Sequence, residues 1–463
     1  MRFALFFGNR GFFPEHLISS ARNEVASAVE ELGHEYICLK EDATRYGAVE
    51  TAAEGRTYSG FLKENEGDYD GVILCLPNFG DENGAVAALE NCGVPILVQA
   101  YPDEIGKMDF ANRRDAFCGK ISVMDVFCQY GLPFTAFAPH TTHPSSGTFK
   151  KHLQDFAAVC RVVKGMKKVT VGAIGARTTA FKTIRFDELT LQRYGITTEA
   201  LDLSEVFMRF RDIRTDDDRF EQKSMRLSSY TNWCGVPDEK FTSLVKLGIV
   251  LDDIIEEYAL DSIALRCWIE LEKEIGVSPC VLLSEINDRG ISAACELDVC
   301  NAVAMRALSL ASGRAATCLD WNNNYGEVED KCILFHCGPV PQSLMTAKGD
   351  VIDHPMFAKS FGAGCGWGCN VGRIAASPFT FASSKTQEGK LVFYLGEGEF
   401  TADEIEDGYF GCAGVARIED LQNKLLSIGK KGFRHHVGVT SDHVVKAVKE
   451  AFQTYLKYDI TDI

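Results

Sequence analysis

The chain has 463 residues, of which 46% are hydrophobic and 24% are charged, so it can bury large cores and is long enough for roughly two to four domains. Its formal net charge of −17 argues against a nucleic-acid backbone as a partner, because like charges repel. A local group of arginines could still bind a small anion.

Residues 1–160 alternate strand and helix patterns. Apolar runs at 3–7, 36–39, 71–77 and 95–99 predict buried strands, and apolar residues at helical spacing predict helices at 15–32 and 84–91. Such alternation is typical of a parallel sheet with helices on both faces. The polar, turn-rich stretch 140–147 is expected to be a linker.

The alternating pattern restarts after this linker. Residues 167–177 predict the first strand and turn of a second sheet, 195–202 a helix end and the next strand, 260–275 a long amphipathic helix, and 297–311 a helix with one apolar stripe. From about residue 330, frequent turn signals and a strand pattern at 390–399 indicate antiparallel β structure, which a helix at 443–456 closes.

We therefore predict an α/β protein with two Rossmann-like, doubly wound parallel-sheet domains at 1–160 and 161–318. A mainly antiparallel, β-rich C-terminal domain with a terminal helix follows at 319–463. The glycine pairs 8/11 and 172/175 follow strand patterns, but neither completes G-x-G-x-x-G, and no acid follows at the spacing of a dinucleotide site. No nucleotide cofactor is predicted.

The seventeen cysteines are scattered and mostly lie in apolar stretches, which favours free buried thiols in a reducing cytoplasm over disulfides. Cys365 and Cys369 do not have C-x-x-C spacing and no second pair accompanies them, so they predict no metal or redox site. The apolar N-terminal run is too short for a signal peptide, and no run approaches the ~18 apolar residues of a membrane span. We expect a cytoplasmic protein.

Two acidic residues and a histidine pair carry the strongest chemical signal. Glu296 and Asp320 each end a short apolar run, where a side chain can leave a buried strand and enter a cleft, and His435 and His436 lie near the C-terminus. Two carboxylates and one imidazole suit a hard, six-coordinate cation such as Mn²⁺ or Mg²⁺ better than zinc or copper. If these residues converge, the protein is a metal-dependent enzyme.

Four segments that include these residues resemble the L-fucose/L-arabinose isomerase superfamily, and its L-fucose isomerase-related branch in particular. They are residues 7–14, 293–296, 319–324 and 432–436. The resemblance runs from end to end and implies three domains in the predicted order. It also implies an aldose–ketose isomerase that uses Mn²⁺, or another divalent cation such as Mg²⁺ or Co²⁺.

Residue by residue, the resemblance implies that Glu296 and Asp320 are metal ligands that also shuttle protons. One of the two histidines matches the ligating histidine, and we favour His436 over His435. His336 lies where the arabinose branch has a further ligand, which the fucose branch lacks. Each residue alone has an ordinary structural interpretation, such as a turn cap, a helix-dipole partner or a solvated surface group. Their agreement with one family pattern favours the metal site.

The chemistry of the reaction agrees with this residue set. Moving a carbonyl from C1 to C2 of a sugar means removing the C2 proton and returning it to C1, through a cis-enediol. A cation that grips O1 and O2 stabilises the charge that develops, and a carboxylate over the C1–C2 bond can act as base and then as acid.

Substrate-binding residues are harder to predict. Trp321 and Asn322, which follow Asp320, join His435 and His336 in the expected set. Arginines at 10, 113, 114 and 177 could bind an anionic group in bidentate fashion, although surface salt bridges are the ordinary alternative. The resemblance implies that N-terminal loops complete the site of a neighbouring subunit, which adds Arg10 and Phe12 and predicts a homo-oligomer, most simply a hexamer. The apolar loop 12–14 fits a subunit contact.

The branch that the chain resembles also includes isomerases of sulfoquinovose, a glucose with a C6 sulfonate. The resemblance therefore makes sulfoquinovose the leading expected substrate and 6-deoxy-6-sulfofructose the expected product. Arg10, flanked by Gly8 and Gly11, would offer a guanidinium beside free backbone N–H groups at a helix start. The alternatives are L-fucose, L-arabinose and D-arabinose. Two alternatives of other kinds are a metal aldolase and a non-catalytic sugar-binding protein, since Rossmann-like lobes also build periplasmic binders; the acid–acid–histidine set has no use in the latter.

Overall fold

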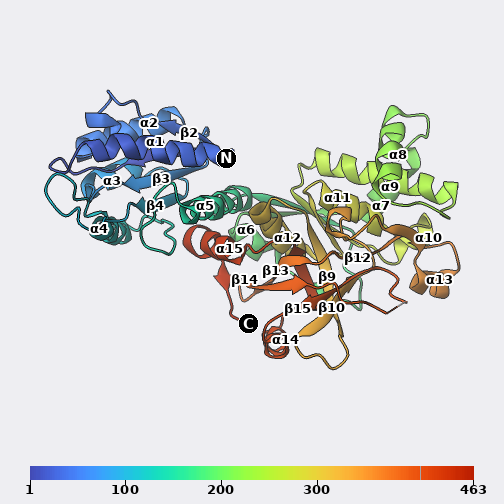
Figure 1. The fold of residues 1–463 in the computed structure, drawn as a ribbon. Coiled ribbons are helices and arrows are strands. Elements are labelled where there is room, and N and C mark those ends of the chain that lie inside the picture. The colour runs from blue at the N-terminus through green and yellow to red at the C-terminus, as the bar shows by residue number, and fades with distance from the viewer. Residues whose placement is uncertain (407) are drawn as a thin grey trace. The chain divides into compact units, whose positions relative to one another are not determined.

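The computed structural model describes residues 1–406 and 408–463, which form two compact units. The first unit contains residues 1–164 and 450–457, and the second contains residues 165–449 and 458–463. In Figure 1 the colours from blue to teal mark most of the first unit, and those from green to red most of the second. Each unit is described by itself.

The first unit is built on a four-stranded parallel sheet in the order β2-β1-β3-β4. Its strands are β1 (Arg2–Phe7), β2 (Glu35–Cys38), β3 (Gly71–Leu76) and β4 (Ile96–Ala100). Its helices are α1 (His16–Glu31), η1 (Arg45–Gly47), α2 (Ala52–Glu64), α3 (Glu82–Leu89), α4 (Ala116–Gln129) and most of α5 (Gly147–Met166), with η4 (Ala451–Leu456) from the C-terminal part. All four predicted strands are confirmed within about a residue. In β1, β3 and β4 the continuous apolar runs are buried on both faces, whereas β2 is only partly buried.

The second unit begins with another four-stranded parallel sheet, in the order β6-β5-β7-β8. These strands are β5 (Val169–Ile174), β6 (Ile196–Leu201), β7 (Ser262–Leu265) and β8 (Ser292–Cys295). Its helical segments are η2 (Lys182–Ile184), α6 (Glu188–Arg193), α7 (Leu203–Asp212), α8 (Asp218–Tyr230), α9 (Asp238–Glu257), α10 (Glu270–Glu274), α11 (Cys280–Asp288) and α12 (Val299–Ser312).

One predicted helix in this region is wrong. Residues 260–275 form strand β7 and the short helix α10 instead of one long helix, and the long helix is α9, which precedes them. The error has a physical reason. All of β7 is buried, and a short, continuously apolar run does not distinguish a buried strand from a buried helical segment. The loop between β7 and α10 carries Trp268, which matters for the site below.

The rest of the second unit is a nine-stranded, mainly antiparallel sheet, as the sequence predicts after residue 330. Its strands are β9 (Ala316–Asn324), β10 (Lys331–His336), β11 (Asp350–Asp353), β12 (Trp367–Arg373), β13 (Ser377–Gln387), β14 (Lys390–Phe400), β15 (Cys412–Arg417), β16 (His436–Thr440) and β17 (Asp459–Ile460). Its helical segments are η3 (Gln342–Leu344), α13 (Pro355–Phe361), α14 (Leu421–Lys430) and α15 (Val445–Glu450). The predicted terminal helix is therefore α15 continued by η4.

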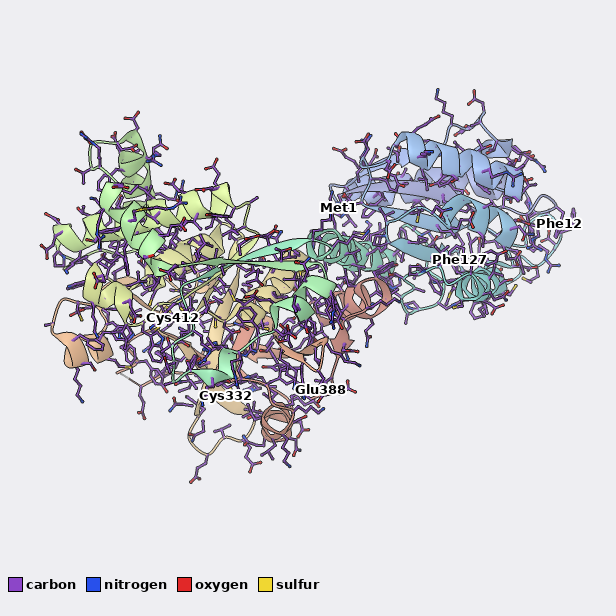
Figure 2. All side chains as sticks on the ribbon, turned by 180° about the vertical axis from the view of Figure 1, so that it is seen from behind. Met1, Phe12, Phe127, Cys332, Glu388 and Cys412 are labelled. Carbon is purple, nitrogen blue, oxygen red and sulfur yellow. The ribbon has the colours of Figure 1, made fainter. Side chains whose placement is uncertain are left out.

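An additional pairing between β14 and β15 closes six of these strands into a ring, in the order β15-β10-β9-β16-β13-β14. Figure 2 labels Glu388 at the turn between β13 and β14, and Cys332 and Cys412 on the paired strands β10 and β15. Ring closure fixes the register of the central strands, so residues at their ends keep fixed neighbours. No helix among the described residues is long and apolar enough to cross a membrane.

The end of β10, which carries His336, depends on a close approach of two backbones. A Cβ atom added to Gly411 would lie 2.3 Å from the carbonyl oxygen of His336 and 2.9 Å from Cα of Cys337. We expect Gly411→Ala to lower the free energy of unfolding by about 1–3 kcal/mol, because backbone atoms cannot yield as a flexible side chain can. Urea unfolding measures this.

Gly429 in α14 is the matched control. A Cβ atom there would meet no other atom within 4 Å, and alanine is a better helix former than glycine. Gly429→Ala should leave stability unchanged or raise it by up to about 1 kcal/mol. Equal effects of the two substitutions would contradict the close-approach argument.

Candidate active site

The first acidic residue of the site leaves the carboxyl end of the parallel strand β8. Glu296 and the following Leu297 have φ angles of 63° and 66°, in the left-handed region that costs a non-glycine residue on the order of 1–3 kcal/mol. This turn directs the Glu296 carboxylate toward two donors. Oε1 accepts a hydrogen bond from Trp268 Nε1 at 3.0 Å, and Oε2 lies 3.0 Å from Nε2 of His436. Such strain is typical of functional positions.

The second acidic residue and the histidine face each other across two antiparallel strands. Asp320 on β9 pairs in register with His436 on β16, and directly opposed residues place their side chains on the same face of a sheet. Asp320 Oδ1 lies 3.5 Å from His436 Nε2. Glu296, Asp320 and His436, which are far apart in the sequence, therefore meet at one imidazole nitrogen.

The other nitrogen of His436 is held by a third carboxylate, which the sequence analysis missed. Asp298 Oδ2 lies 2.9 Å from His436 Nδ1, and its other oxygen pairs with the Arg434 guanidinium. All three side chains are buried. Burial alone would raise the pKa of Asp298, but the charge of Arg434 and the bond to His436 outweigh it and lower the pKa. An ionised Asp298 fixes the orientation of the imidazole.

This arrangement requires a positive charge at Nε2 of His436. If Nδ1 donates its proton to Asp298, a neutral ring has a lone pair on Nε2, directed at two carboxylates. A second proton on the ring would give Nε2 a hydrogen that faces these carboxylates. Burial and the nearby Cys318 act in opposite directions on the pKa of His436, and together with the bonds to Asp298 and Glu296 the net effect raises it well above its ordinary value.

The donor set also fits a divalent cation. Asp320 Oδ1 is buried and has no hydrogen-bond partner, and His436 Nε2 is buried and forms no regular hydrogen bond although Glu296 Oε2 lies 3.0 Å away. Both features are uncommon for buried polar atoms and are explained if an ion binds there. Two carboxylates and one imidazole are oxygen and nitrogen donors of the kind that Mn²⁺ and Mg²⁺ prefer. The residues present therefore fit such an ion.

His336 reaches the same place from the end of β10, with its ring centroid 5.8 Å from that of His436. Its Nδ1 accepts a hydrogen bond from the backbone N–H of Cys337 at 2.9 Å, so the proton of a neutral ring lies on Nε2. Nε2 has no partner in the structure. In this tautomer His336 Nε2 is a hydrogen-bond donor, while one ligand atom each from Cys318, His336 and His436 also lie within 4.8 Å of one another.

His435 lies beside the cluster although its side chain is exposed. One ligand atom each from Glu296, His435 and His436 lie within 4.8 Å of one another, and His435 Nε2 is 3.6 Å from Asp320 Oδ1. The His435 ring packs edge-on against that of Phe181. Asn322 lines the cavity described below. Trp321 packs instead against Phe381 and donates a hydrogen bond to Tyr394, in the core of the second unit.

Arg10 and Phe12 belong to the first unit. The Arg10 guanidinium pairs with Glu82, bonds the carbonyl of Gly80 and lies over the ring of Phe79. The neighbouring backbone N–H groups, from residues 8, 9 and 10, donate to Cys75, Val49 and Asn78, and α1 begins only at residue 16. The N–H groups of residues 8, 9 and 10 are therefore not free to bind an anion, because the turn itself uses them.

A cavity of about 830 Å³ opens beside the cluster. Glu296, Asp320 and His336 line it, together with aromatic side chains of α13, Tyr409 and Phe410. None of the described lining residues is lysine or arginine. All seventeen cysteines are free thiols, as predicted, and three of them, Cys267, Cys280 and Cys337, line the cavity. The sulfurs of Cys280 and Cys337 are 3.8 Å apart.

Comparison with known proteins decides the family. A model described as "Fucose/sulfoquinovose isomerase, N-terminal domain" matches residues 4–167, and one described as "L-fucose isomerase, C-terminal domain" matches residues 334–463. The chain belongs to the fucose/sulfoquinovose isomerase family. It is therefore an aldose–ketose isomerase, as the sequence predicts, and the non-catalytic alternative is set aside.

Individual relatives support this membership. A protein named "Sulfoquinovose isomerase" from Priestia megaterium is 24% identical over 396 residues, which cover 84% of this chain and 85% of the relative. Another protein of that name, from Alkalicoccus urumqiensis, is 20% identical over 395 residues, with the same two coverages. The alignment with a solved periplasmic solute-binding protein from Actinobacillus succinogenes, with bound D-allose, covers 68% of this chain and 92% of that protein at 14% identity. The TM-score of 0.17 does not indicate a shared fold.

Glu272 in the cavity wall gives a test of electrostatics that needs no substrate. Burial raises the pKa of Glu272 from 4.5 to about 8. The folded protein therefore keeps this proton while the unfolded chain loses it, so Glu272 lowers stability as pH rises from about 4.5 to 8. Glu272→Gln should be more stable than the wild type at pH 7, by up to about 3 kcal/mol, and equally stable at pH 4.

Urea unfolding at both pH values measures the difference. Glu274→Gln, on the exposed side of the same short helix, is the control and should change little at either pH. A stability gain of Glu272→Gln that is the same at pH 4 and pH 7 would show that ionisation is not its cause.

Proposed function

We propose that this isomerase is metal-dependent and moves the carbonyl of its sugar between C1 and C2 through a cis-enediol. The observation that carries the proposal is the contact of His436 Nε2 with the carboxylates of Glu296 and Asp320, at 3.0 and 3.5 Å. Mn²⁺ is the expected ion, with Mg²⁺ or Co²⁺ as substitutes, and these three residues would hold it.

Each side chain has a definite part in this proposal. When bound, the cation supplies the positive charge that stabilises the developing enediolate. Trp268 holds one oxygen of Glu296, so this carboxylate is fixed in orientation while it takes the C2 proton and returns it to C1. Asp320 assists in the proton relay, since its Oδ1 has no protein donor. His336 donates from Nε2 to a sugar oxygen.

The reaction class is tested by exchange of the C2 proton. We expect the Mn²⁺-loaded protein to exchange the C2 proton of its aldose with solvent deuterium. Glu296→Gln should lower the exchange rate by about 10²–10⁴-fold, because an amide cannot accept the proton. Nuclear magnetic resonance measures the exchange. Glu397→Gln, on strand β14, is a carboxylate control that should exchange at the wild-type rate.

Two results would contradict the proposal. A protein that binds no divalent cation and exchanges no proton of any aldose is not an isomerase of this kind. Carbon–carbon cleavage without exchange would instead favour the metal aldolase.

The proposed substrate is sulfoquinovose, converted to 6-deoxy-6-sulfofructose, and the support is the printed name of relatives that match over 84% of this chain. L-Fucose, L-arabinose and D-arabinose remain the alternatives. A sulfonate is a permanent anion, yet no lysine or arginine is among the described residues that line the cavity. A guanidinium would have to come from elsewhere, and Arg10 remains the candidate although it already pairs with Glu82.

A panel of aldoses with and without a sulfonate tests this choice. If Arg10 binds the sulfonate, Arg10→Ala should raise KM for sulfoquinovose at least about tenfold and leave KM for neutral sugars unchanged, because a charge-assisted bond is worth about 1.5–3 kcal/mol. Arg45→Ala, in the neighbouring loop, is the control. Good turnover of neutral sugars alone, or an unchanged KM in Arg10→Ala, contradicts the anion role of Arg10.

The proposal includes a homo-oligomer, with a hexamer as the simplest form, in which the loop around Phe12 contacts a neighbouring subunit. Phe12, which Figure 2 labels, belongs to the first unit. Its side chain is 66% exposed and its ring stacks on that of Phe13. Other large apolar side chains of the first unit are exposed as well: Ile105, Met108, Phe110, Phe117 and Ile121. Exposed apolar groups in such number are typical of interfaces.

The three-domain division at 1–160, 161–318 and 319–463, with two Rossmann-like domains, also remains a proposal. Its support is that each of the first two ranges contains one four-stranded parallel sheet.

A further inference from the structure

Two polar groups in the cavity wall have no partner and belong to neither the metal ligands nor His336. Oε2 of Glu272 and Nδ1 of His354 are both buried without a hydrogen bond, and both residues line the cavity. The side chains are only 2% and 3% exposed. Buried polar atoms without partners are rare, so two of them in one cavity wall call for a ligand.

Backbone contacts bring these two residues to one part of the wall. Glu272 Oε1 accepts a hydrogen bond from the hydroxyl of Ser278 at 3.0 Å, and the backbone N–H of Ser278 donates to the carbonyl of Trp367 at 2.8 Å. The backbone N–H of His354 donates to Gly366, the residue before Trp367. Glu272 and His354 therefore flank the same turn at the start of β12.

This pair is separate from the metal cluster. Glu272 belongs to α10 and His354 precedes α13, whereas the cluster comes from β9, β16 and the turn after β8. No hydrogen bond or ion pair that the described part of the chain forms joins the two groups. The surroundings of the pair are aromatic, since the His354 ring lies 4.2 Å from that of Phe357 and 5.1 Å from that of Phe410. Aromatic faces and a few polar groups are typical of small-molecule sites.

We propose that Glu272 and His354 form a distal subsite, which hydrogen-bonds an oxygen at the end of the sugar remote from C1 and C2. The inference rests on the proposed function, because the cluster must hold O1 and O2 for the far end to reach this pair. The ligand is an acceptor oxygen, either a hydroxyl of a neutral hexose or a sulfonate oxygen.

The two side chains suit this task. Burial keeps Glu272 protonated at neutral pH, so Oε2 carries a hydrogen that it can donate. His354 Nδ1 donates or accepts according to its tautomer, so the pair can match a hydroxyl, which does both, or a sulfonate, which only accepts. A site built to bond such a group rejects an analogue that lacks it, because its own polar atoms are then left unpaired.

The test compares variants on long and short substrates. Glu272→Leu and His354→Leu should each raise KM for a six-carbon aldose by about fivefold or more, with a smaller effect on kcat. They should leave kinetics with glyceraldehyde unchanged, because a three-carbon aldose has no distal oxygen. Glu272→Gln should keep the wild-type KM, since its amide can still donate.

Ser360→Ala, which removes another polar group of the same cavity, is the matched control and should not distinguish long from short aldoses. The variants are assayed separately with sulfoquinovose and with neutral hexoses. A loss confined to sulfoquinovose assigns the sulfonate to the subsite, and a loss for both assigns a hydroxyl.

A binding measurement separates this inference from the proposed function. Calorimetry with a hexitol, which cannot react, should show weaker binding to both leucine variants than to the wild type. If the wild type isomerises no aldose, the proposed function fails. If the wild type is active but the variants lose equal activity toward glyceraldehyde and hexoses, or bind the hexitol as tightly as the wild type, the distal subsite is wrong.

Discussion

The site depends on one buried imidazole that has a carboxylate at each ring nitrogen. His436 faces Asp298 through Nδ1 and Glu296 and Asp320 through Nε2. Three carboxylates and the single guanidinium of Arg434 leave two negative charges in a place where charge is costly. A proton on His436 balances one of these charges, and a divalent cation at Nε2 balances both. The charge of the surrounding groups thus matches that of the proposed divalent ion.

The fold fixes the positions of these charged side chains. Glu296 stands on a turn of two left-handed residues between β8 and α12, and Asp298 accepts a hydrogen bond from the backbone of Asn301 at the start of that helix. Asp320 and His436 are fixed by strand register within a closed ring of strands. The parallel and the antiparallel sheet therefore each contribute one carboxylate to the proposed metal site, and moving either carboxylate would disturb the packing of a whole sheet.

Much of this could be predicted from sequence. Strands such as β1 and β3 are continuous apolar runs, and the acids Glu296 and Asp320 end two such runs, so both the sheets and the candidate ligands carry local signals. The choice of His436 as a candidate ligand came from the resemblance to the family. The helix predicted at residues 260–275 was wrong, because a four-residue buried strand followed by a short helix has the same apolar content as one helix.

What the sequence could not reveal are contacts between distant segments. Arg434 lies within one of the resembling segments and Asp298 lies two residues after another, yet nothing local indicates that they pair over 136 positions. Glu272 and His354 are ordinary polar residues in sequence, and only the structure reveals that their polar atoms are buried and unpartnered. Trp321 follows Asp320 directly in strand β9, so its side chain lies on the opposite face of the sheet, because neighbouring residues of a strand alternate in direction. This alternation could have been predicted from the sequence alone.

The most direct test of the central claim is the anomalous scattering of Mn²⁺ in crystals of the full chain. The account predicts one strong anomalous peak at coordination distance from Glu296 Oε2, Asp320 Oδ1 and His436 Nε2, with Asp298 still bonded to Nδ1. A peak elsewhere in the chain, with His436 still lying between its carboxylates and no metal beside it, would contradict it.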